Sequence, residues 1–275
     1  MSSATAGPGG NPFAGPALLF CPADRPERFG KAAAAADVVI LDLEDGVRPE
    51  ARDAARRALR AADLDPARTL VRVNAAGEEQ DRDLEAVAAT PFDLVMLAKA
   101  ESAEQVRALA PLRVVALCET ARGVLAAPEI AAAGAAALMW GAEDLLASLG
   151  GRSSRRADGG YRDVARHARS SVLLAAGAHG VAAVDAVYLD IPDLDGLRVE
   201  SEEAAATGFA AKACIHPTQV AVVREAFRPP AEEVAWARRV LDAAEGRHGV
   251  FAFEGRMVDA PVLRHAEAVL RAAVD

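Results

Sequence analysis

VVILDLEDGV (residues 38–47) is a short apolar run that ends in an acidic pair. Runs of this length, rich in valine and isoleucine, are typical of buried β-strands. Glu44 and Asp45 follow the run directly, where such a strand ends. This segment therefore predicts a buried strand that carries two carboxylates at its carboxyl end.

Similar apolar runs recur along the chain, separated by longer amphipathic segments that are rich in alanine. Together there are eight: ALLF (17–20), VVILDL (38–43), LVRV (70–73), LVMLA (94–98), VVALC (114–118), ALMW (137–140), AVYLD (186–190) and AKACI (211–215). The intervening segments have helical spacing, as in RPEARDAARRALRAA (48–62) and SAEQVRALAPL (102–112). Strands that alternate with helices indicate a parallel sheet with right-handed crossovers. Eight such units close most naturally into a barrel, so we predict an α/β fold, a (β/α)8 TIM barrel.

Polar residues lie at or just beyond the ends of these runs. They are Glu44, Asp45, Asn74, Lys99, Glu119, Glu143, Asp144, Asp190, Asp193 and His216, with Arg72 two positions before Asn74. Polar residues also begin loops for ordinary reasons, so none of them alone indicates a site. A barrel, however, gathers the carboxyl ends of its strands on one face, where the active sites of this fold are built. The sequence thus predicts one cluster of charged side chains.

The two ends of the chain differ from the middle. Residues 1–15 are rich in glycine, proline, serine and alanine, and we expect a mobile tail there, followed by the barrel over 16–228. Residues 229–275 hold two helical stretches, 229–245 and 259–274, joined by a segment with the pattern of a hairpin around Glu254-Gly255. We expect this C-terminal region to be a helical appendage outside the barrel, for which the resemblance given below implies the role of a lid.

Composition excludes several classes of protein. The net charge is -9 and no block of lysine and arginine is present, which argues against nucleic acid or an anionic membrane as the partner. No apolar stretch reaches the length of a membrane span and the N-terminus lacks the pattern of a signal peptide, so we expect a cytoplasmic protein. Cys21, Cys118 and Cys214 lie far apart, as reduced thiols in or near a core would.

Glu119 and Asp144 are the best candidates for metal ligands. Each follows an apolar run, so carboxylates from neighbouring strands can converge on one hard cation such as Mg2+. Without a metal, two unpaired carboxylates would repel each other and one would become neutral. Two other interpretations remain open: Glu119 pairs with Arg122 while Asp144 caps a helix, or the two acids form an acid/base pair without a metal.

The chain resembles the family of the citrate lyase β-subunit, malyl-CoA lyase and citramalyl-CoA lyase. The resemblance covers roughly residues 17 to 272. It is carried, in order, by LFCPADRPERFGKA (19–32), VILDLEDGV (39–47), VRVN (71–74), MLAKAES (96–102), ETARGV (119–124), WGAEDL (140–145), KACIHPTQV (212–220) and GRMVDAPVLRHAEAVL (255–270). Eight segments at matching intervals are far more specific than any one motif.

The resemblance implies a role for each candidate residue. Glu119 and Asp144 match the family's two Mg2+ ligands, for which Mn2+ can substitute. Arg72 matches the arginine that holds the carboxylate end of the substrate. The remaining positions are implied to contact substrate: Glu44 and Asp45 beside the metal, Gly141, Ala142 and Glu143 in a loop whose amides receive the keto-acid carboxylate, and Arg25 and Lys31 near the CoA or carrier moiety.

Asp259 matches an acid in the C-terminal lid that exchanges a proton with the α-carbon of the thioester, in this family often across a subunit boundary. It also precedes Ala260, Pro261 and a helix, which is the position of an N-cap, and the two roles are compatible. Arg72 could instead only bridge the acidic cluster, and His216 could be structural. Lys99 could pair with Glu101 or Glu119 or face a substrate phosphate.

The resemblance implies a Mg2+-dependent carbon-carbon lyase that cleaves or forms a short 3-hydroxyacyl-CoA thioester such as malyl-CoA or citramalyl-CoA, releasing acetyl-CoA and a keto acid. It also implies a homo-oligomer, a trimer or hexamer. Three alternatives remain: a citrate lyase β-subunit acting on a citryl acyl-carrier thioester, a Schiff-base aldolase using Lys99 or Lys212, and a non-catalytic barrel scaffold. Ala98, Gly46 and Trp140 depart from the family's common residues, and the last two leave the identity of the acyl group open.

Overall fold

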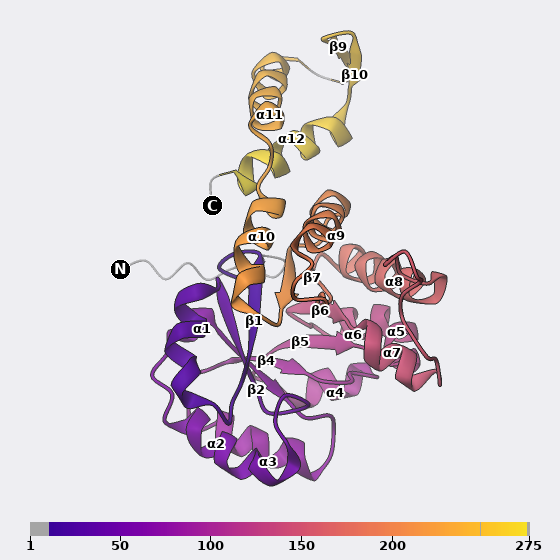
Figure 1. Ribbon diagram of the computed structural model, residues 1–275. Coiled ribbons are helices and arrows are strands. Elements are labelled where there is room, and N and C mark those ends of the chain that lie inside the picture. The colour runs from indigo at the N-terminus through magenta and orange to yellow at the C-terminus, as the bar shows by residue number, and fades with distance from the viewer. Residues whose placement is uncertain (1–10, 248, 274–275) are drawn as a thin grey trace. The chain divides into compact units, whose positions relative to one another are not determined.

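The computed structural model describes residues 11–247 and 249–273 (Figure 1). The chain divides into two compact units between Arg224 and Glu225, close to the boundary expected between residues 228 and 229. Within the described residues, no helix combines the length and the apolar character needed to cross a membrane.

Eight parallel strands form a closed barrel in the first unit, in the order of the sequence (Figure 1). The strands are β1 (Ala17–Pro22), β2 (Val38–Asp42), β3 (Thr69–Val73), β4 (Leu94–Leu97), β5 (Arg113–Cys118), β6 (Ala137–Trp140), β7 (Ala182–Asp185) and β8 (Ala211–Cys214). The barrel closes where Leu18 of β1 pairs with Ala213 of β8. The predicted fold class and seven of the eight predicted strands are confirmed.

The seventh strand was predicted in the wrong place. AVYLD (186–190) has more β-branched and aromatic residues, but the strand is β7, whose residues Val184 and Asp185 pair with Ala211 and Lys212 of β8. In the loop that follows, Ala186 and Tyr188 are buried without strand pairing, whereas Leu189 is exposed. Asp190 and Asp193 therefore lie beyond the strand end, and Asp193 caps the next helix by accepting the Gly196 amide at 2.9 Å.

Helices follow the strands and surround the barrel (Figure 1). They are α1 (Phe29–Ala35), α2 (Arg52–Arg60), α3 (Glu78–Val87), α4 (Ala103–Ala108), α5 (Ala121–Leu125), α6 (Ala127–Ala132), α7 (Ala142–Ser148), α8 (Asp163–His179), α9 (Leu194–Thr207) and α10 (Pro217–Phe227). Local sequence explains their ends: Ser102 and Gln105 form a capping box at α4, and Gly180 and Gly208 end α8 and α9 in the left-handed conformation.

Alternate residues of the strands fill the barrel interior. This core includes Leu18, Ile40, Leu70, Met96, Val115, Leu117, Met139, Val184 and Ala213, all buried. Phe13 is buried in the same core, three residues before the expected start of the barrel at Pro16. Of the expected mobile tail over 1–15, residues 1–10 lie outside the described residues. The three cysteines are buried and free, as predicted.

A buried ionic network joins β7 and β8 to helices α8 and α9. Lys212 Nζ donates to Asp185 Oδ2 at 2.8 Å, to the Ala186 carbonyl at 2.8 Å and to Glu200 Oε1 at 2.9 Å. Asp185 also accepts from Arg169 Nε at 2.9 Å and from the indole of Trp140 at 2.7 Å. All three ammonium protons of Lys212 are thus used, as a buried cation requires.

The second unit consists of two helices and a hairpin. Helices α11 (Ala231–Ala244) and α12 (Ala260–Ala272) pack together around Ala237, Val240, Ala266 and Val269, and β9 (Phe251–Phe253) pairs antiparallel with β10 (Arg256–Val258). Glu254 and Gly255 form the turn, with φ of 47° and 75°. Two successive left-handed residues are the signature of a two-residue hairpin turn, so the predicted hairpin is confirmed.

Candidate active site

Asp42 and Arg72 face each other across neighbouring strands, where they are partners in the register of β2 and β3. The guanidinium of Arg72 donates from Nε to Asp42 Oδ1 at 2.7 Å and from Nη2 to Oδ2 at 2.6 Å. Its Nη1 lies 3.1 Å from Glu44 Oε2. Burial opposes the charge of Arg72, but the hydrogen bonds and charges of Asp42 and Glu44 outweigh it and raise the arginine's pKa. Arg72 therefore bridges the acidic cluster, as one interpretation of the sequence held.

Asp42 was missed as a site residue by sequence reasoning. It lies two positions before Glu44, and the two-residue period of a strand places both on one face, which is the signal that could have found it. Its carboxylate also accepts from the Glu44 amide at 3.0 Å and the Gly46 amide at 2.8 Å. A Cβ on Gly46 would lie 2.2 Å from Asp42 Oδ2, so glycine is required at position 46 in this arrangement.

Lys99 connects the acidic pair to the candidate metal ligands. Its ammonium donates to Glu44 and, at 3.2 Å, to Asp45 Oδ2, and it lies 3.6 Å from Asp144 Oδ1. Its backbone has a left-handed φ of 50°, and its amide donates to Glu119 Oε1 at 3.1 Å. Burial lowers the lysine's pKa, but its hydrogen bond to Glu44 and the surrounding acids raise it overall. Lys99 does not pair with Glu101, which was one of the possibilities left open.

Glu119 and Asp144 line the same cavity, as the sequence predicted. Glu119 is 3% exposed, and burial together with the charge of Asp144 raises the pKa of its carboxyl to about 8. Arg122 lies near Glu101, at 3.9 Å, rather than near Glu119. Asp144 belongs to the first turn of α7, whose N-cap is Gly141, so it is not the helix cap. The interpretation in which Glu119 pairs with Arg122 while Asp144 caps a helix is therefore wrong.

These two carboxylates fit a divalent cation. Glu119 is a buried acid whose neutral form is favoured by its surroundings, and a cation between it and Asp144 would reverse that preference. The described residues contain no cluster of three acidic, histidine or cysteine ligands. Two protein carboxylates, with the other positions left to substrate oxygens and water, are the usual arrangement for Mg2+. The donor set is oxygen only, which also suits Mn2+.

The cavity between them is small and its walls are partly apolar. Its volume is about 90 Å³. Its lining consists of Phe20, Arg72, Leu117, Glu119, Met139, Trp140, Gly141, Ala142, Glu143, Asp144, Ala186 and Val187. The guanidinium of Arg72 lies 4.8 Å above the ring of Phe20. A lining that combines charged and apolar residues suits a short acid whose carboxylate the charged groups bind.

Gly141, Ala142 and Glu143 begin α7 at the edge of this cavity, as expected for the loop that the resemblance indicated. Gly141 permits close packing, because a Cβ there would lie 2.8 Å from both Cβ and Oε2 of Glu119. Arg25 and Lys31 are exposed, in the loop after β1 and in α1, and neither lines the cavity. Their contact with a CoA or carrier moiety stays a prediction.

Two other predicted strand-end residues have structural roles. Asn74 Nδ2 donates to the Leu43 carbonyl at 3.0 Å and to Asp83 Oδ2 at 2.7 Å, which holds the loops after β2 and β3 together. His216 is exposed, and its Nδ1 lies 2.8 Å from the Thr218 hydroxyl at the start of α10. Neither residue lines the cavity.

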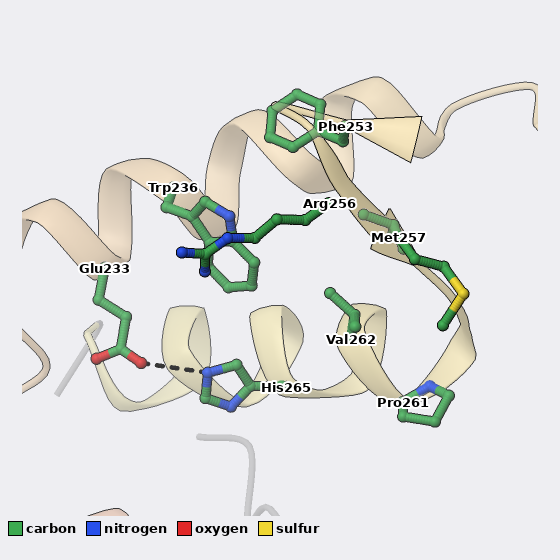
Figure 2. A pocket seen from close by; sticks show the side chains of 9 residues that line it. Glu233, Trp236, Phe253, Arg256, Met257, Pro261, Val262 and His265 are labelled. Carbon is green, nitrogen blue, oxygen red and sulfur yellow. Dashed lines mark ion pairs between the residues drawn. The ribbon is translucent and has the colours of Figure 1, made fainter. Parts of the chain in front are cut away.

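Asp259 lies in the C-terminal unit, where it caps α12 by accepting the Val262 amide at 3.3 Å. The predicted N-cap is thus confirmed, and the proton-transfer role stays a prediction. That unit has a cavity of its own, about 570 Å³, between α11, the hairpin and α12 (Figure 2). Glu233 and His265 pair across it at 3.2 Å beside Trp236. It offers one carboxylate, already paired, so it lacks the donors of a metal centre.

Residues 17–217 match the model of the HpcH/HpaI aldolase/citrate lyase family. The chain belongs to this family. The HpcH/HpaI member described here is similar to the citrate lyase subunit beta-like protein of Mycobacterium tuberculosis, 64% identical over 262 residues that cover 94% of this chain and 96% of the relative. It is 33% identical to the mitochondrial citramalyl-CoA lyase of Homo sapiens, over 91% of this chain and 83% of that protein.

A crystal structure of a similar protein adds ligands to this comparison. The protein CitE from Mycobacterium tuberculosis, in complex with magnesium, acetoacetate and coenzyme A, superposes on this chain with a TM-score of 0.91 and 64% identity. The match covers 95% of this chain and 99% of that one. The HpcH/HpaI family is one of aldolases and lyases, and this member is an enzyme of that kind.

Proposed function

We propose that this chain is a Mg2+-dependent carbon-carbon lyase that cleaves, or forms, a short 3-hydroxyacyl-CoA thioester such as malyl-CoA or citramalyl-CoA, with acetyl-CoA and a keto acid as products. The observation that carries the proposal is the buried carboxylate of Glu119 facing the same cavity as Asp144. The similar CitE structure, which holds magnesium, a keto acid and coenzyme A, and the related citramalyl-CoA lyase support it.

The residues of the cavity divide the work of this reaction. Cleavage of the bond between C2 and C3 leaves an enolate on the thioester and a carbonyl on the keto acid. Glu119 and Asp144 would hold Mg2+, which supplies positive charge near the oxygen that becomes the carbonyl. Arg72, fixed by Asp42 and Glu44, presents its remaining N–H groups toward a substrate carboxylate.

The remaining parts of the site would bind and protonate the thioester half. The amides of Gly141, Ala142 and Glu143 would also receive the keto-acid carboxylate. Asp259 would transfer the proton at the thioester's α-carbon, and residues 229–275 would act as the lid that excludes water from the enolate. We further propose that the chain works in the cytoplasm as a homo-oligomer, a trimer or hexamer.

A Schiff-base aldolase is disfavoured by both candidate lysines. The mechanism needs a neutral amine with a lowered pKa. Lys99 and Lys212 are both bound by carboxylates, which raise their pKa values, and Lys212 is fully buried. A non-catalytic scaffold is disfavoured because the acids and Arg72 are all present. A citrate lyase β-subunit would instead copurify with its partner subunits and use an acyl-carrier thioester.

The decisive experiment is a panel of 3-hydroxyacyl-CoA substrates, each incubated with the protein and Mg2+, with acetyl-CoA followed by chromatography. We expect acetyl-CoA from at least one substrate, loss of its formation with excess chelator, and recovery with Mg2+ or Mn2+. Full activity in chelator would contradict the metal assignment. Absence of acetyl-CoA from every substrate would contradict the proposed reaction.

A further inference from the structure

A short segment between α7 and α8 folds back on itself beside the cavity. In residues 153–162, the Arg162 amide donates to the Ser154 carbonyl at 2.8 Å and the Arg156 amide donates to the Gly160 carbonyl at 2.8 Å. Arg155 and Tyr161 form an isolated β-bridge. We call residues 153–162 the strap. Its backbone bonds fix the position of Ser154 relative to the rest of the segment.

The strap is attached to the buried ionic network through Arg155. Arg155 Nη1 lies 2.8 Å from Glu200 Oε2, and Glu200 in turn accepts from Lys212. The guanidinium also stacks on two aromatic rings, 3.9 Å from the centroid of Tyr161 and 4.9 Å from that of Tyr188. The Arg155 side chain is partly buried and makes several contacts, so it holds the strap in a fixed position on the barrel.

The strap reaches the first turn of α7 through one hydroxyl. Ser154 is 2% exposed, and its Oγ donates to Glu143 Oε1 at 2.6 Å. Glu143 directly precedes Asp144 in that turn, and the N-cap, Gly141, has no side chain to bond the turn's amides. The hydrogen bond from Ser154 is thus a side-chain tether at the helix end that carries a candidate metal ligand.

We propose that Ser154 is a positioning residue for the metal site. Its hydroxyl holds Glu143, and this fixes the first turn of α7 so that the carboxylate of Asp144 stays in the cavity with that of Glu119. The inference rests on the proposed function, since it assumes that Glu119 and Asp144 hold a divalent cation. Partners that hydrogen-bond metal ligands directly typically contribute about 10-fold to 100-fold in metal affinity, and we expect the lower end of this range for a tether that acts through the adjacent residue.

The test measures binding of Mn2+ alone, by the electron paramagnetic resonance signal of the free ion, with no substrate present. We expect Ser154→Ala to raise the Mn2+ dissociation constant by about tenfold, with a melting temperature close to that of the wild type. Ser154→Thr, which keeps the hydroxyl, should restore binding. Ser153→Ala is the matched control, because that exposed hydroxyl bonds only the backbone of Arg155 within the strap.

A double-mutant cycle identifies the route. If the tether acts through Glu143, then Glu143→Ala should weaken Mn2+ binding as Ser154→Ala does, and the double variant should be no weaker than either single one. Unchanged binding in Ser154→Ala, or effects of the two changes that simply add, would overturn the inference while leaving the proposed function intact. Absence of Mn2+ binding in the wild type would overturn the proposed function and this inference with it.

Discussion

Glu119 and Gly141 lie so close together that position 141 has no room for a side chain. A Cβ there would lie 2.8 Å from both Cβ and Oε2 of Glu119, and real Cβ atoms do not approach other heavy atoms so closely. The strand-end acid of β5 and the first residue after β6 are thus fitted to each other. This contact sets where the Glu119 carboxylate can lie in the cavity.

Gly141→Ala should therefore displace Glu119. We expect the affinity for Mn2+ to fall by about tenfold or more, because the added methyl moves a proposed ligand. Isothermal titration calorimetry measures this directly. Gly177→Ala is the control. Gly177 lies in α8 with open space where a Cβ would be added, so this change should raise stability by about 0.5 kcal/mol without changing metal binding. Unaltered affinity in Gly141→Ala would mean that Glu119 is not a ligand in this position.

Glu119→Gln should separate metal binding from folding. Burial and the charge of Asp144 already favour the neutral carboxyl of Glu119. The Glu119→Gln variant, which carries a neutral amide there, should therefore unfold at the same temperature as the wild type or slightly above it. Turnover and Mn2+ binding should both be lost. Differential scanning calorimetry and the acetyl-CoA assay measure the two effects. Glu50→Gln, an exposed position outside the cavity, serves as the control, and a Glu119→Gln enzyme with normal turnover would remove this residue from the site.

Asp259→Asn distinguishes a helix cap from a proton donor. Asparagine caps a helix about as well as aspartate, so stability should be retained. If Asp259 transfers the proton, turnover should fall on the order of 100-fold, and exchange of the acetyl-CoA methyl protons with solvent should fall in parallel. Nuclear magnetic resonance in deuterated water follows that exchange. Normal turnover would exclude Asp259 from the mechanism.

Hybrid oligomers extend this test to the subunit boundary. We expect a mixture of Asp259→Asn and Glu119→Gln protomers to regain part of the activity if the C-terminal unit of one subunit serves the site of another. Glu119→Gln is preferred to Arg72→Ala as the second variant, because removing Arg72 would leave Asp42 and Glu44 without the cation that they share. A mixture that stays inactive would place the whole site within one chain.

Asp185 should control acid stability. Burial raises its pKa, but Lys212 and Arg169 outweigh burial and lower it overall. A lowered pKa gives stability above the unfolded value of about 3.9, which is lost as the pH falls through the folded pKa. Asp185→Asn should therefore cost about 3 kcal/mol in urea unfolding near neutral pH, and the difference from the wild type should shrink below about pH 4. Asp63→Asn, at an exposed site, should show neither effect, and a difference that does not depend on pH would contradict the assignment.

The barrel could be predicted because most of its strands are buried on both faces. They appear in the sequence as continuous apolar runs, as in VVILDL and VVALC. The seventh strand escaped prediction because half of its four residues are alanine, as in the alanine-rich helices around it, whereas the neighbouring 186–190 has the composition of a strand. Composition indicates β-propensity, but pairing with β6 and β8 decided which residues form the strand.

The site was predictable where its residues follow strand ends. Glu119 and Asp144 were found in this way, and both line the cavity. The link that Lys99 makes between the acidic pair and Asp144 was not predicted, because it depends on a left-handed backbone conformation that lysine rarely adopts. Ser154 could not be found either, since it comes from a loop without periodicity and its bond to Glu143 exists only in the folded chain.

The contact between Gly46 and Asp42 has an evolutionary consequence. Since a methyl group at position 46 would overlap Asp42 Oδ2, position 46 can gain a side chain only where the acid at position 42 is lost or moved. A relative with alanine at this position would have to hold the acid of this strand in another way, and with it the arginine that the acid orients. We therefore expect positions 42, 46 and 72 to vary as a group across the family.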